Sequence, residues 1–299
     1  MAGKRLDRVP GFCFHGRVTR TPEIPAARRD ATASRTASLR AAWGPLALSY
    51  ATAQLVEVFL HEGSHALAAR ALGFHPAIGQ FVELHVPSAE RAQEALVAAA
   101  GPVGSLVTGL VCWALYRRRG PSYPRLLLMW LAMTGVAAFL GYLVVTPLLA
   151  PGDTGVVARL YHVPVAVQFL VAAAGMALLY LVTRPLSRMY LDSLPASVPL
   201  DTPRARKAAV TRLWIPYFLG LALLVPAALG GDPEVVFYGI LGCWGPGMAL
   251  VGFMTPNAGR PYERRKRTET GWRLPVWAFL AYAAVVAFYL LVLRPGLHI

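Results

Sequence analysis

Charged side chains are scarce in this sequence. Only 15% of the 299 residues are Asp, Glu, Lys or Arg, whereas an ordinary soluble domain contains roughly 25%. Uncharged stretches such as 126–150 and 274–293 are long enough for a helix to cross about 30 Å of hydrocarbon. The shortage of charge therefore argues against a soluble globular protein and predicts an integral membrane protein.

Cysteine is also rare, with three residues in the chain and no CxxC pair among them. Cys112 and Cys243 lie within apolar stretches, and Cys13 stands alone near the N-terminus. A disulfide framework and a metal site built from cysteines alone are therefore not expected.

Acidic residues are outnumbered by basic ones, which gives a net charge of +14. Aromatic side chains that could stack on bases are not interleaved with the basic runs, so we expect no nucleic-acid partner. Most Lys and Arg residues lie between apolar stretches, where they orient the chain and meet the anionic headgroups of a lipid bilayer.

The apolar stretches predict an all-α polytopic membrane protein with about seven transmembrane helices. Residues 74–87, which follow the first of them, alternate in part between apolar and polar side chains and predict a short hairpin at the membrane boundary. The predicted spans cover residues 43–72, 94–116, 125–149, 164–183, 209–229, 235–254 and 274–293.

Residues 1–40 contain nine basic and three acidic side chains and no apolar segment of a signal peptide. Their composition predicts a disordered basic arm; an organelle transit peptide is the alternative. The positive-inside rule places the N-terminus in the cytoplasm, and the Ala- and Arg-rich composition suggests a bacterial cytoplasmic membrane. Only four of the 29 Lys and Arg residues then lie on the other side, namely Arg70, Arg91, Arg159 and Arg294.

One motif in the first span points to chemistry: His61-Glu62-Gly63-Ser64-His65. Two histidines at positions i and i+4 project from one helix face, so their imidazoles can bind one Zn²⁺ ion. Glu62, beside them, can act as the general base that takes a proton from a zinc-activated water. The alternative is a hydrogen-bonded polar cluster, but in a transmembrane helix three such groups need a compensating partner, and a metal is the simplest one.

A catalytic zinc site needs a third protein ligand. Asp153 is the only acidic residue between Glu94 and Asp192, and it follows the third span. We therefore predict that His61, His65 and Asp153 bind the metal. A helix N-cap is the alternative role for Asp153.

Four other residues stay open as neighbours of this site. His162 is the best substitute third ligand, and His75 or His85 could approach from the boundary hairpin. Glu57 lies one turn before His61, where it could orient a ligand imidazole or pair with an arginine.

These residues resemble the site-2 protease family of intramembrane zinc metalloproteases over about residues 45–160. The motif at His61–His65, the run Ala100-Gly101-Pro102-Val103-Gly104-Ser105 and Asp153 after the third span carry the resemblance. It implies zinc held by His61, His65 and Asp153, with Glu62 as the base. The chain departs from the family in having Ser105 after Gly-Pro instead of asparagine, Asp-Thr-Gly instead of Asp-Gly, and no PDZ-like insertion.

Together these features predict three parts: the arm (1–40), a three-helix metalloprotease-like core (41–160) and additional transmembrane helices (161–299). The leading hypothesis is a zinc endopeptidase that hydrolyses a peptide bond in or near a transmembrane segment of another membrane protein. The alternative is a non-enzymatic transporter or assembly factor in which the same residues bind a metal or protons. A less favoured reading takes the third ligand from a downstream glutamate, namely Glu234, Glu263 or Glu269.

Overall fold

The computed structural model describes residues 40–85, 90–148, 152–263 and 274–299. The predicted arm over 1–40 therefore lies outside the described residues, apart from its last position. The same holds for Glu269 and for the last two positions of the predicted hairpin segment, 86 and 87.

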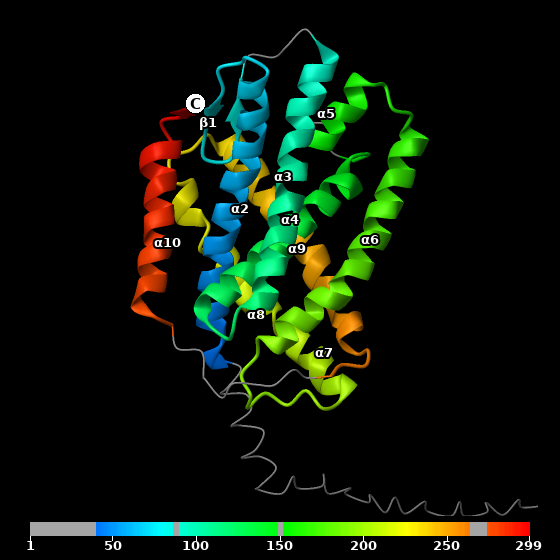
Figure 1. Ribbon diagram of the computed structural model, residues 1–299, viewed down its shortest axis with the longest axis vertical. Coiled ribbons are helices and arrows are strands. Elements are labelled where there is room, and N and C mark those ends of the chain that lie inside the picture. Colours follow the sequence, from blue (N-terminus) through cyan, green and yellow to red (C-terminus); the bar gives the residue numbers. More distant parts are fainter. Residues whose placement is uncertain (1–39, 86–89, 149–151, 264–273) are drawn as a thin grey trace, which may run out of the picture.

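The described chain is an all-α bundle with one very small sheet, as the apolar stretches predicted (Figure 1). Its long apolar runs form helices because a helix satisfies every backbone hydrogen bond within itself, which a hydrocarbon environment demands. The helices are α2 (Trp43–Ala71), α3 (Arg91–Arg118), α4 (Tyr123–Val145), α5 (Asp153–Leu160), α6 (Val165–Asp192), α7 (Pro203–Thr211), α8 (Trp214–Ala222), the 3₁₀ turn η1 (Val225–Ala228), α9 (Pro233–Ala258), α10 (Val276–Phe288) and the π-helical turn η2 (Tyr289–Leu293).

Six segments of the described chain are long and apolar enough to cross a membrane. They correspond to the last six predicted spans, so the protein is a polytopic membrane protein. They are α3, α4, α6, the broken helix Pro203–Ala228, α9, and α10 with η2.

The first predicted span forms a 29-residue helix, α2, but it is not one of the six apolar segments. Its position explains its lower hydropathy. Helix α2 packs against α3, α4, α8 and α10, and Figure 1 shows it between α10 and α3. Because other helices surround it, α2 can carry polar side chains that meet protein instead of lipid.

The predicted boundary hairpin is present and is extended by a third strand. Strands β1 (Ala77–Ile78) and β2 (Glu83–Leu84) pair antiparallel, with Ala77 opposite Leu84. Strand β3 (Leu297–His298) pairs with the other edge of β1, which gives the order β2-β1-β3. The C-terminal strand therefore lies at the end of the bundle where α2 finishes, opposite the start of α2 (Figure 1).

Close contacts between α2, α3 and α4 hold the part of the bundle that carries the motif. Tyr50 of α2 packs edge-on against Trp130 of α4, with 5.0 Å between ring centroids. Helices α3 and α4 touch at glycines: a Cβ on Gly135 would lie 2.4 Å from the Ser105 carbonyl oxygen. The three helices therefore meet at a fixed spacing around the motif.

Candidate metal centre

The two motif histidines and the distant aspartate meet in one group. The Nε2 atoms of His61 and His65 are 3.2 Å apart. Asp153 Oδ2 lies 3.0 Å from His61 Nε2 and 3.4 Å from His65 Nε2. Both imidazoles are buried. The structure thus brings together the three predicted ligands, and among the described residues this is the group of His, Cys, Asp and Glu side chains whose geometry could hold a metal ion.

The group lies well inside α2 and away from the ends of the bundle. At 1.5 Å per residue, His61 is about 15 Å along the axis from the end of the helix at Ala71. Any reaction at this group would therefore take place within the depth that the neighbouring membrane spans cover.

The ring of His65 presents Nε2 to the centre because its other nitrogen is already bonded. His65 Nδ1 lies 2.7 Å from the backbone carbonyl oxygen of Val97 in α3. A carbonyl oxygen only accepts hydrogen bonds, so Nδ1 carries a proton, and in the neutral ring Nε2 then has a lone pair available for a metal. This is the arrangement that a metal-binding histidine needs.

Gly101 of the Gly101-Pro102 pair makes room for that ring. A Cβ built on Gly101 would lie only 2.1 Å from Nε2 of His65. Any larger residue would push the imidazole out of the group. The glycine of the Gly-Pro run is therefore explained by a steric contact with the candidate metal centre.

Asp153 is the first residue of α5, and it does not cap the helix. The N-cap residue is Gly152, and no side chain caps this end. The next residue, Thr154, donates a hydrogen bond to the Tyr142 carbonyl oxygen of α4 at 2.8 Å. It also accepts one from Thr146 at 2.6 Å. Thr154 thereby ties α5 to α4 and holds the Asp153 carboxylate toward the histidines.

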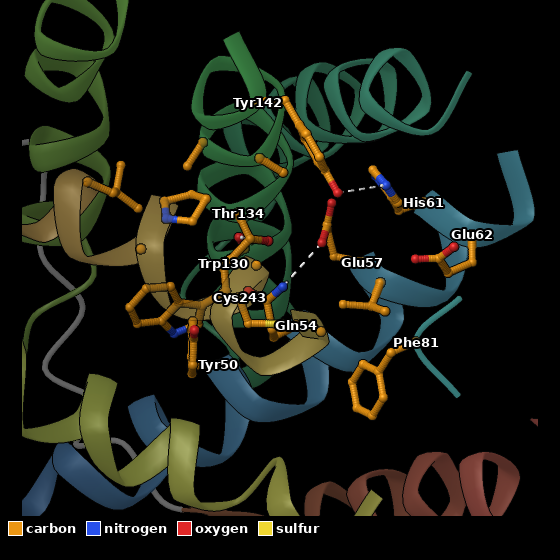
Figure 2. Close-up of a pocket in the computed structure, with 18 of the residues that line it drawn as sticks. Tyr50, Gln54, Glu57, His61, Glu62, Phe81, Trp130, Thr134, Tyr142 and Cys243 are labelled. Atoms are coloured by element: carbon orange, nitrogen blue, oxygen red, sulfur yellow. Dashed lines mark hydrogen bonds between the residues drawn. The ribbon is translucent and has the colours of Figure 1, made fainter. Parts of the chain in front are cut away.

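Tyr142 is a member of the site that the sequence reasoning did not identify. Its hydroxyl lies 3.3 Å from His61 Nε2, and its ring stacks on the imidazole at 5.3 Å with an angle of 8°. Figure 2 shows the hydroxyl directed at His61. One signal could have found it. Tyr142 and Thr146 are polar residues one turn apart in an otherwise apolar run that leads to Asp153.

A cavity of about 70 Å³ opens beside the group, between α2, α4 and α9. Since a single water needs roughly 10–15 Å³ of such space, the cavity can hold several. In Figure 2 the carboxylate of Glu62 points into this space next to His61, and both residues line it. Glu62 is therefore positioned to exchange protons with water at the group.

The other candidate ligands lie elsewhere. His75 pairs with Arg70 at 3.3 Å. His162 follows the end of α5 in a left-handed backbone conformation (φ 49°). Neither belongs to the group of converging ligands, and the same is true of Glu234 and Glu263 among the described downstream glutamates.

His85 has acidic partners of its own outside the membrane-spanning helices. Its Nδ1 lies 2.9 Å from Glu83 and its Nε2 lies 3.2 Å from Glu94. Partial burial lowers the pKa of His85, but the hydrogen bonds and charges of the two glutamates outweigh it and raise the pKa above its usual value. His85 therefore links the hairpin to the start of α3.

Among the described residues, Glu57 has serine and glutamine as partners and pairs with no arginine. Ser105 of α3 donates to Glu57 Oε1 at 2.6 Å, and Gln54 donates to Oε2 at 3.2 Å. Ser105 Oγ in turn lies 2.9 Å from His61 Nδ1. Of the two roles left open for Glu57, the contacts agree with support of a ligand imidazole.

Comparisons of the chain with protein-family models, with curated proteins and with solved structures found no match.

Proposed function

We propose that this membrane protein is a zinc metalloprotease that hydrolyses a peptide bond in or near a transmembrane segment of another membrane protein. The observation that carries the proposal is the convergence of His61 Nε2, His65 Nε2 and Asp153 Oδ2 from two separate elements. The resemblance to the site-2 protease family supports it, because the matching positions are the ones that converge.

The donor set and its spacing suit zinc. The three donor atoms are 3.0, 3.2 and 3.4 Å apart. Ligands at about 2.0–2.2 Å from a tetrahedral zinc are about 3.3–3.6 Å apart, which small side-chain movements from these distances would reach. Two imidazoles and a carboxylate also leave the fourth position open, as hydrolytic zinc sites require.

Zinc held by these residues would supply a Lewis acid that polarises a peptide carbonyl and makes water acidic near neutral pH. Glu62 takes the proton that the attacking water loses and passes it to the amine nitrogen as the C–N bond breaks. The Tyr142 hydroxyl, 3.3 Å from His61 Nε2, is close enough to donate a hydrogen bond to the oxygen of the attacked carbonyl.

The substrate class follows from the depth of the site. Apolar spans surround α2, so a peptide bond that reaches Glu62 belongs to a chain that is itself in the membrane. We place the start of α2 on the cytoplasmic side of a bacterial cytoplasmic membrane, because the basic residues gather at that side.

The decisive experiment measures metal and cleavage separately. The wild-type protein and Glu62→Gln are purified in detergent, their zinc content is determined, and new peptide termini in the membrane proteins of the expression host are compared by mass spectrometry. We expect about one zinc per chain in both proteins and new termini with the wild type alone.

Two other results would contradict the proposal in different ways. Zinc without any cleavage in the wild type would favour the transporter or assembly factor with a metal site. Equal cleavage by the wild type and Glu62→Gln would remove Glu62 from the role of base.

A further inference from the structure

A continuous line of buried hydrogen bonds leads away from His61 on the side opposite the proposed metal. It runs from His61 Nδ1 to Ser105 (2.9 Å), from Ser105 to Glu57 (2.6 Å) and from Glu57 to Gln54 (3.2 Å). The four residues are 6%, 0%, 3% and 5% exposed, respectively. Bulk solvent therefore does not compete for these bonds, and their direction is set by the chain itself.

The direction of each bond can be derived from the atoms involved. Ser105 donates its single hydroxyl proton to Glu57 Oε1, so this proton does not go to the imidazole. The Ser105 oxygen then has only lone pairs left for the imidazole, so Nδ1 of His61 must carry the ring proton. In the neutral ring, Nε2 of His61 then has the lone pair that a metal needs, on the side where this atom lies 3.0 Å from Asp153 Oδ2.

We infer that Glu57, acting through Ser105, is the positioning residue that holds His61 in its metal-binding tautomer. The inference rests on the proposed metal centre, but it does not require that the protein be a protease. Glu57 lies one turn before the motif at His61–His65, and the inference assigns it a role in metal binding although it is not part of that motif.

The two ligand histidines differ in this respect. His65 donates to the backbone carbonyl of Val97, and no side-chain substitution removes that acceptor. The orientation of His61 depends instead on two side chains from different helices, Ser105 of α3 and Glu57 of α2. Loss of either one frees the ring of His61 to turn or to move its proton to Nε2, where a proton blocks metal binding.

The test measures zinc affinity by competition with a chelator for the wild type, Ser105→Ala, Glu57→Leu, which removes the acceptor of the Ser105 proton, and the double variant. Loss of a partner that orients a ligand typically lowers metal affinity about 10–100-fold, and we expect a drop of this size for each single variant. Because the two residues act in series, the double variant should lose no more than the weaker-binding single variant.

Two further variants separate positioning from general damage to the fold. Ser105→Thr keeps the hydroxyl and should bind zinc within about threefold of the wild type. Ser49→Ala removes another buried serine hydroxyl of the bundle, which donates only to the Leu46 carbonyl, and should not change zinc affinity. The unfolding temperature of each metal-free variant shows whether it is folded. If Ser105→Ala is not folded, the zinc affinity of Glu57→Leu decides.

The outcomes distinguish this inference from the proposed function. Single variants that bind zinc as tightly as the wild type, or losses that multiply in the double variant, would overturn the role of Glu57 and leave the zinc site standing. A wild type that binds zinc but cleaves nothing would overturn the protease and leave the role of Glu57 to be decided by affinity. A folded wild type that binds no zinc would overturn both.

Discussion

Helices α2 and α6 have almost the same length, 29 and 28 residues, and opposite surroundings. In α6 only 11% of the most apolar window is buried within the protein. Its large apolar side chains face outward, among them Phe169, Leu170, Leu178 and Leu181. In α2 more than half of the residues are buried, and several of these are polar.

The difference shows what hydropathy measures in a membrane protein. A helix that faces lipid must be apolar, because hydrocarbon offers no partner to a polar group. A helix enclosed by other helices can hold polar groups if each one has a partner. In α2 the partners are supplied by α3 and α5, which meet Glu57, His61 and His65. The long helix that is not among the six apolar segments is therefore the one that holds the two histidines of the candidate metal centre.

The contrast between α2 and α6 depends on a metal ion that compensates the polar side chains of α2. The largest predicted effect is therefore on the metal content of the protein. Asp153→Ala should abolish stoichiometric zinc binding, because two imidazoles alone leave the site short of a protein ligand. His162→Ala, nine positions further along the chain, should bind zinc like the wild type. Zinc analysis of the purified variants checks both, and loss of zinc in the His162 variant instead would move the third ligand there.

A second prediction sharpens the comparison within α6. Leu179 is 1% exposed and belongs to the core, whereas its neighbour Leu178 is 51% exposed. Leu179→Ala should lower the free energy of unfolding by about 2–5 kcal/mol because it opens a cavity. Leu178→Ala should change it by less than about 0.5 kcal/mol. Denaturation in detergent micelles measures both, and equal effects would mean that α6 is not lipid-facing on the Leu178 side.

A third prediction concerns Gly101 of α3, which packs against the His65 ring of α2. Gly101→Ala should lower zinc affinity about tenfold or more, since its Cβ would overlap the His65 ring and overpacking typically costs about 1–3 kcal/mol. Gly252→Ala, in α9, is the matched control because no atom lies within 4 Å of its added Cβ. Chelator competition is the measurement, and an unchanged affinity in the Gly101 variant would show that α3 can move away.

The smallest effect is expected outside both helices, at the hairpin. The pKa of His85 is raised in the folded protein by Glu83 and Glu94, against the effect of burial. Its stabilising contribution is therefore fully present below about pH 6.5, the usual pKa of histidine, and is lost as the pH rises through the raised pKa. Limited proteolysis of the hairpin should be slower at about pH 6 than at about pH 9. The His85→Gln variant should lose this difference.

The long elements could be predicted from the sequence because their signal is local. Each apolar run is long enough to require a helix, and the predicted first span, 43–72, differs from α2 by one residue. The eight-residue helix α5 and the two-residue strand β3 were missed. Neither is long enough to produce a periodic pattern.

The candidate site likewise has residues that could be predicted from the sequence and a contact that could not. His61, Glu62 and His65 stand in one motif, and Asp153 is a rare acid in an apolar region, so all four could be found from the sequence. The contact between Ser105 and Glu57 could not, because 48 positions separate the two residues. It depends on how closely α3 packs against α2, which no local pattern records.

The sheet has a consequence for the order in which the protein is completed. Strand β1 is paired on one side with β2, a few residues away, and on the other with β3, after the last helix. During synthesis β1 therefore keeps one free edge until every helix between them has been made. The hairpin beside the motif becomes fully paired only when α10 has entered the bundle and β3 has been made, so this end of the protein closes after all the helices between β1 and β3 are in place.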